Sequence, residues 1–123
     1  MKSILIADDD ELMRWQLGRM VRGCGGEIVC SAASVEEVER HPSLDLKSID
    51  AAIVDYEFEG HDKTGIDLIR YLKAHGVPKV FLCTGYYEDE DVCAEANTAG
   101  ADFVIPKPVD EQCLCSLIRN EAD

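Results

Sequence analysis

The sequence predicts an α/β domain in which five parallel strands form a doubly wound sheet with the order 2-1-3-4-5. Short apolar runs alternate with helical patterns along the whole chain. These runs lack an alternation of apolar and polar residues, which indicates strands buried on both faces and covered by helices. Right-handed crossovers between such strands favour this strand order. The length of 123 residues fits one domain, so we expect residues 1–123 to fold as a single unit.

The first three strands are predicted from the apolar runs at residues 4–7, 27–32 and 51–54. A short helix follows the second strand, because Ser34 and Glu37 have the spacing of a capping box. The first strand is followed by a longer helix, whose apolar side chains recur on one face at Met13, Leu17, Met20, Val21 and Cys24.

The remaining elements continue the alternation of strand and helix. A helix capped by Thr64 precedes the fourth strand, at residues 80–83. A helix over residues 88–99 leads to the fifth strand, at residues 103–105. Asp110 is expected to cap the last helix.

The charge balance argues against several classes of protein. Asp and Glu number 25 and Lys and Arg number 12, which gives a net charge of −13. A surface this acidic repels nucleic acid and anionic lipid, so we expect neither as a partner. The early apolar run at residues 4–7 is too short for a signal peptide or a membrane helix. We therefore expect a cytoplasmic protein.

The six cysteines contain no CxxC pair, which argues against zinc-ribbon and thioredoxin-like sites. Most lie in apolar stretches, where a free thiol packs as a small hydrophobic group. An even number also permits disulfides, but without a secretory signal we favour free, buried thiols. The cysteines are Cys24, Cys30, Cys83, Cys93, Cys113 and Cys115.

Polar side chains that can bind ions or take part in catalysis follow four of the five predicted strands. Because neighbouring strands lie about 4.8 Å apart, these side chains are expected to converge at one edge of the sheet. They are Asp8, Asp9 and Asp10 after the first strand, Asp55 after the third, Thr84 after the fourth and Lys107 after the fifth. We interpret Asp10 as a helix cap and the other residues as a site.

A cluster of carboxylates is stable only when another group offsets the repulsion between their charges. At 4 Å and an effective dielectric of 20, each like-charged pair costs about 4 kcal/mol. A proton, a lysine or a divalent cation could offset this cost, and oxygen ligands alone select Mg²⁺ or Mn²⁺. Because Mg²⁺ also binds phosphate oxygens, the pattern indicates phosphoryl chemistry with an aspartate as nucleophile. Lys107 and Thr84 would then stabilise charge on the transferred group.

In this order, these residues resemble the receiver domain of two-component response regulators, and the resemblance covers the whole chain. The matching pieces are Asp8-Asp9, Asp55, Thr84-Gly85, the segment Ala99-Gly100-Ala101-Asp102 and Pro106-Lys107-Pro108. The resemblance implies that Asp55 is the phosphoacceptor. It also implies that Asp9 binds the metal directly, that Asp8 acts partly through water, and that the backbone carbonyl of Glu57 is a further ligand.

The resemblance also implies a switching function. Thr84 would turn toward the phosphoryl group and Lys107 would pair with it. A sensor histidine kinase or a histidine phosphotransfer protein would donate the phosphoryl group, and the altered surface of the last helices would bind a downstream protein. Such a domain assists its own phosphorylation and dephosphorylation and is not otherwise an enzyme.

Two features depart from the family pattern. Glu59 replaces a usual proline, and Gly65 follows Asp55 by ten residues instead of eight, so the loop between them is expected to be longer. Val104 stands where many receivers have an aromatic residue that changes rotamer. The tyrosines at 86–87 are the alternatives for that aromatic role.

Three other functions share parts of this pattern. A receiver that never accepts phosphate could serve as a docking module. A Mg²⁺-dependent phosphohydrolase could use Glu57 as its acid–base group, but it usually needs a cap domain, for which 123 residues leave no room. A flavodoxin-like electron carrier would need a Ser/Thr/Gly-rich phosphate loop after the first strand, where this chain has acids, so we reject it.

Overall fold

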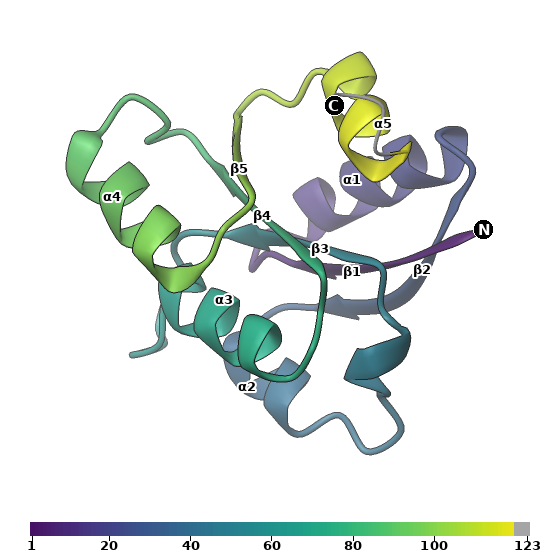
Figure 1. The fold of residues 1–123 in the computed structure, drawn as a ribbon, viewed down its shortest axis with the longest axis horizontal. Coiled ribbons are helices and arrows are strands. Elements are labelled where there is room, and N and C mark those ends of the chain that lie inside the picture. Colours follow the sequence, from purple (N-terminus) through teal and green to yellow (C-terminus); the bar gives the residue numbers. More distant parts are fainter. Residues whose placement is uncertain (120–123) are drawn as a thin grey trace.

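The computed structural model describes residues 1–119 and confirms the predicted fold (Figure 1). A five-stranded sheet has the order β2-β1-β3-β4-β5, and all of its neighbouring strands are parallel. The strands are β1 (Lys2–Ala7), β2 (Gly26–Ala32), β3 (Ala51–Asp55), β4 (Lys79–Thr84) and β5 (Phe103–Pro106).

The helices cover both faces of the sheet. Helices α1 and α5 lie on one face, and α2, α3 and α4 lie on the other (Figure 1). The helices are α1 (Glu11–Gly23), α2 (Val35–Glu39), α3 (Gly65–Ala74), α4 (Glu90–Ala99) and α5 (Glu111–Arg119), with a short 3₁₀ helix η1 (Leu46–Ser48) before β3.

Each central strand contributes to two hydrophobic cores. In β1, Ile4 and Ile6 pack with α1 and α5, whereas Leu5 and Ala7 pack with the helices of the opposite face. All four side chains are 0% exposed, so the strand is buried on both sides as the apolar run predicts. The same division holds in β3 and β4.

Four helices start at the side-chain caps that the sequence indicates. The caps that accept backbone N–H groups are Asp10, Ser34, Thr64 and Asp110. The capping box of α2 is shifted by one residue, because Glu37 accepts from the backbone of Ala33. Helix α4 begins at residue 90 and not at 88, because Asp89 acts as its cap. Gly100 ends α4 with φ of 108°, a conformation that favours glycine.

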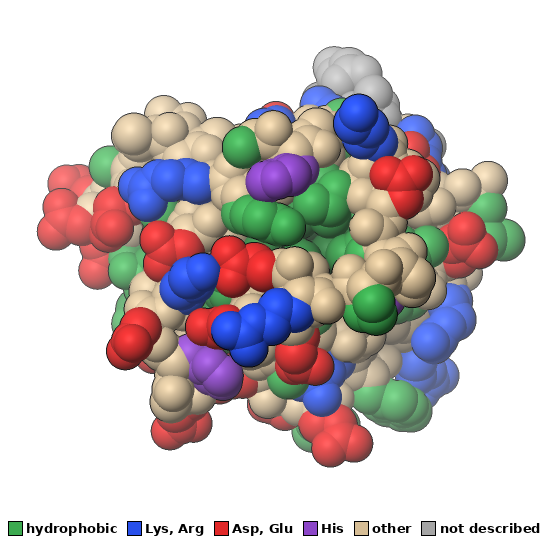
Figure 2. Space-filling model, turned by 90° about the horizontal axis from the view of Figure 1, so that it is seen from below, with side chains coloured by type: hydrophobic (Ala, Val, Ile, Leu, Met, Phe, Trp, Pro, Cys, Tyr) green, Lys and Arg blue, Asp and Glu red, His purple; other side chains and the backbone are tan. Residues whose placement is uncertain are grey.

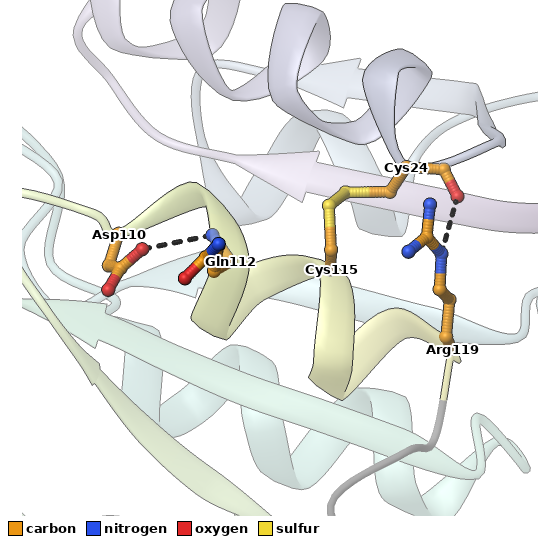
Figure 3. Close-up of a disulfide and its surroundings, with 5 residues drawn as sticks. All are labelled: Cys24, Asp110, Gln112, Cys115 and Arg119. Carbon is orange, nitrogen blue, oxygen red and sulfur yellow. Dashed lines mark hydrogen bonds between the residues drawn. A yellow bond between two sulfur atoms is a disulfide. The ribbon is translucent and has the colours of Figure 1, made fainter.

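The expectation of free cysteines is wrong for two of them. Cys24 and Cys115 form a disulfide between α1 and α5, with a Cα–Cα distance of 5.2 Å (Figure 3). This separation lies within the range that a disulfide spans. Cys30 and Cys83 are free and buried as predicted, whereas free Cys93 and Cys113 are partly exposed.

The surface carries intermixed charges. Figure 2 shows acidic and basic side chains distributed around a small hydrophobic hollow on the face seen from below. Among residues 1–119, no helix has both the length and the apolar character needed to cross a membrane.

Candidate functional site: an acidic cluster at the carboxyl edge of the sheet

The sheet brings the predicted site residues together at one edge. Asp8 and Asp9 follow β1, and Asp55 is the last residue of β3. One carboxylate oxygen from each of these residues lies within 4.8 Å of the others. The convergence expected from the strand order is therefore present, in a geometry that one small cation could bridge.

Lys107 lies beside two of these carboxylates. Its Nζ is 2.9 Å from Oδ1 of Asp55 and 3.2 Å from Oδ2 of Asp8. The backbone N–H of Lys107 donates to the carbonyl of Thr84, which holds the segment after β5 against the end of β4. One lysine against three carboxylates leaves the cluster with a net negative charge.

Burial shifts the pKa values of several groups in and beside this cluster. Burial raises the pKa of Asp55 to about 6, and the charge of Asp8 adds to this effect, whereas Lys107 opposes it. Burial alone would lower the pKa of Lys107, but its hydrogen bond to Asp55 and the charges of Asp55 and Asp8 outweigh this, and the net pKa is raised. Burial raises the pKa of the neighbouring Cys83 to about 12, which keeps this thiol protonated and unreactive.

The backbone fixes the two N-terminal carboxylates in different ways. Asp8 is 1% exposed, and its Oδ1 accepts from the backbone N–H of Asp10 at 2.9 Å. Asp9 is half-buried, and its Oδ2 accepts from the backbone N–H of Glu59 at 2.9 Å. The more exposed Asp9 is thus the better placed of the two for direct contact with an ion from solvent.

Thr84 is buried at the end of β4, next to the cluster. Its Oγ1 accepts from the backbone N–H of Tyr86 at 3.0 Å. The ring of Tyr86 is half exposed and packs edge-to-face on Tyr56, with 6.0 Å between ring centres. Val104 packs with the core beneath α2, α3 and α4, whereas Phe103 is exposed, so the aromatic side chain of β5 lies away from that position.

Comparison with known proteins identifies the family. Residues 4–119 match the family model described as the response regulator receiver domain. The chain belongs to this family.

Curated relatives of this receiver domain are longer proteins. The chain is 28% identical over 112 residues to a cyclic di-GMP phosphodiesterase of Thermotoga maritima, covering 91% of the chain and 28% of that protein. It is 30% identical over 117 residues to the DNA-binding transcriptional regulator NtrC of Escherichia coli, covering 94% of the chain and 24% of that protein. The chain therefore spans about a quarter of the length of these two relatives.

A solved structure supports the same assignment. The response regulator receiver domain protein from Clostridium thermocellum superposes with a TM-score of 0.83 at 28% identity. The match covers 98% of this chain and 93% of that one, so the receiver fold extends across nearly all of both.

The loop between Asp55 and α3 is anchored at several points. The side chain of Phe58 is only 4% exposed and packs in the core. Lys63 pairs with Glu39 of α2 at 2.7 Å. These anchors, together with the bond from Glu59 to Asp9, hold the acidic loop over the site. The loop charges are evident in the sequence, but the role of Phe58 is not, because a single aromatic side chain gives no periodic signal.

Gly65 ends this loop at a point of close backbone approach. A Cβ atom at this position would lie 2.0 Å from the carbonyl oxygen of Asp55. The backbone N–H of Gly65 donates to the carbonyl of Tyr56 at 2.8 Å. The glycine thus permits α3 to begin directly against the end of β3, which fixes the position of Asp55.

The cluster opens into a hollow of about 380 Å³. Its donor set consists of oxygen atoms, and its net charge is negative, so the residues fit a hard divalent cation. The volume also leaves room for a phosphoryl group beside such an ion. The hollow is lined by Asp9, Asp55, Tyr56, Glu57, Glu59, Thr84, Gly85, Tyr86 and Lys107.

Proposed function

We propose that Asp55 accepts a phosphoryl group from a phosphohistidine in a reaction that depends on a divalent cation. The observation that carries this proposal is the meeting of three carboxylates within 4.8 Å, with Lys107 2.9 Å from Asp55. Membership of the receiver family supports the phosphoacceptor role of the domain. The hollow in front of Asp55 gives a donor access to the carboxylate.

Asp8, Asp9 and Asp55 would hold Mg²⁺, with the backbone carbonyl of Glu57 as a further ligand. The bound ion would neutralise the carboxylates and the charge that develops on the phosphoryl oxygens. An oxygen of Asp55 attacks phosphorus and forms the acyl phosphate, while the phosphorus–nitrogen bond breaks and its electron pair leaves on the donor imidazole. Lys107 keeps Asp55 oriented during attack and then pairs with the phosphoryl group.

The position of Thr84 would couple phosphorylation of Asp55 to a conformational change. Its hydroxyl oxygen accepts from the backbone N–H of Tyr86. A phosphoryl group on Asp55 offers strong acceptor oxygens close to this hydroxyl, so Thr84 would donate to it and shift the loop before α4. The resulting surface, formed by α4, β5 and α5, would bind a downstream protein.

The proposal extends to partners and location. Receiver domains interact with histidine kinases or phosphotransfer proteins, and we propose such a protein as the phosphoryl donor. We also propose a cytoplasmic location and a single-domain unit over residues 1–123, which the common sheet of the described residues supports. The domain would assist its own phosphorylation and dephosphorylation without acting as an independent enzyme.

A docking module that never carries phosphate is the second candidate, and the presence of Val104 at the usual aromatic position favours it. Incubation with Mg²⁺ and acetyl phosphate, followed by intact mass measurement, distinguishes the two. We expect the mass of one phosphoryl group to be gained by the wild type and not by Asp55→Asn. An unchanged wild-type mass at saturating donor, in a protein that binds Mg²⁺, would favour the docking module.

A further inference from the structure

A covalent bond joins two helices that are distant in sequence. Cys24 caps the C-terminus of α1, and its backbone N–H donates to the carbonyls of Met20 and Val21. Cys115 lies within α5, at a sequence separation of 91 residues. Figure 3 shows the bond crossing directly between the two helices.

Hydrophobic packing also fastens α5 to the domain, and it includes the partly buried Leu117. Leu114 and Ile118 are its buried side chains, and both enter the core beneath α1. Arg119 adds a hydrogen bond from Nε to the carbonyl of Cys24 at 3.3 Å, so the disulfide and this hydrogen bond both join α5 to Cys24 (Figure 3). The packing between α1 and the segment before α5 is incomplete, because a hollow of about 640 Å³ lies between them. Its lining includes Met13, Trp15, Met20, Pro108 and Val109.

The two bonded helices also lead to the acidic cluster. Helix α1 begins at Glu11, shortly after Asp8 and Asp9, and α5 follows the segment that contains Lys107. The disulfide joins the C-terminal end of α1 to the middle of α5, and it therefore constrains the relative positions of two segments that meet again at the site. Loss of the bond would leave α5 held by the packing of Leu114, Leu117 and Ile118 and by one long hydrogen bond.

We propose that Cys24 and Cys115 form a reversible dithiol–disulfide site, through which a thiol reductant releases α5 from α1. In a reducing compartment, intracellular disulfides are usually transient and sense the redox state. The redox role rests on the proposed cytoplasmic location but not on phosphorylation, so the disulfide site can be tested independently of Asp55.

The chemistry is thiol–disulfide exchange with a low-molecular-weight thiol such as glutathione. Cys24 is 5% exposed and Cys115 is partly exposed, so the donor thiolate attacks Sγ of Cys115. The sulfur–sulfur bond breaks, and its electron pair leaves on Sγ of Cys24, which takes up a proton. A second donor thiolate attacks the mixed disulfide and releases Cys115, which is then protonated. Two donor thiols thus supply two electrons and two protons and leave as their own disulfide.

The first measurement counts thiols in the folded full chain. After purification without reductant, alkylation in denaturant should modify the four free cysteines, and after treatment with glutathione it should modify all six. We expect half-reduction at ratios of reduced to oxidised glutathione within the cytoplasmic range. Six reactive thiols before any reductant, or a bond that opens only after denaturation, would overturn the proposal.

The second measurement is amide hydrogen exchange with and without glutathione. Reduction should accelerate exchange across residues 111–119 by at least about tenfold, while the strands of the sheet change little. Equal exchange in α5 before and after reduction would contradict the release of this helix.

Two cysteine variants of the same helix provide matched controls. Cys113→Ser removes a free thiol and should keep the full response to glutathione. Cys115→Ser should show rapid α5 exchange that no longer depends on glutathione. If Cys115→Ser fails to fold, the comparison of oxidised and reduced wild type still decides the question.

Discussion

Replacement of the central carboxylate should stabilise the ion-free protein. Asp55 is partly buried, lies beside Asp8 and has a pKa of about 6 in place of an ordinary value of 3.8. The folded state therefore binds the Asp55 proton more tightly than the unfolded state. The resulting contribution to stability is complete below about pH 4 and is lost as the pH rises through 6. Asparagine cannot ionise, so Asp55→Asn avoids this loss.

The size of the effect follows from the two pKa values. At about 1.4 kcal/mol for each pKa unit, the loss for wild type reaches about 3 kcal/mol at pH 7.5. Solvent screening reduces this, so we expect Asp55→Asn to raise the free energy of unfolding by about 1–2 kcal/mol. Lys107 keeps its second carboxylate partner, Asp8, at 3.2 Å, so the variant does not leave the lysine unpaired.

Urea unfolding in EDTA, followed by circular dichroism with the disulfide intact, tests this prediction. The gain in stability should be about twice as large at pH 7.5 as at pH 5, because wild type is only partly ionised at the lower pH. Asp62→Asn, in the exposed part of the same loop, is the control and should change stability by less than about 0.5 kcal/mol. A variant less stable than wild type at pH 7.5, or an equal gain at both pH values, would refute the reasoning.

Three further predictions concern neighbouring positions. Gly65→Ala should destabilise the fold by about 3 kcal/mol in urea unfolding, because the new Cβ meets the Asp55 carbonyl. The control Gly23→Ala has nothing within 4 Å of its new Cβ and should change stability by less than about 1 kcal/mol. Equal effects of the two substitutions would contradict the close packing at Gly65. Asp9→Ala should abolish the rise in melting temperature that Mg²⁺ gives wild type, and an undiminished rise would place the ion elsewhere. Thr84→Ala should still gain phosphoryl mass on Asp55 but lose the accompanying NMR shifts in α4, and retained shifts would remove Thr84 from the switch.

Local patterns predicted most of the fold. The apolar runs fix β1, β3 and β4 because central strands of a parallel sheet are apolar on both faces. Caps such as Asp10 and Thr64 were predictable because capping depends on side chains within three or four residues. The site residues converge for a related reason, because parallel strands end at one edge whatever the details of the loops.

Contacts between distant segments could not be predicted in the same way. The bond between Cys24 and Cys115 spans 91 residues and depends on how α1 and α5 pack, which no local pattern records. The hydrogen bond from Glu59 to Asp9 depends on a loop conformation that the buried ring of Phe58 anchors. The sequence shows the charges of that loop but not which of its groups face the cluster.

The most direct test of the account identifies the residue that carries the phosphoryl group. After incubation with Mg²⁺ and acetyl phosphate, borohydride reduces an acyl phosphate on aspartate to homoserine, and peptide mass spectrometry locates the product. We expect homoserine at position 55 and none at positions 8 or 9. Homoserine at another aspartate, or none in a protein that has gained phosphoryl mass, would contradict the assignment of Asp55 as the phosphoacceptor.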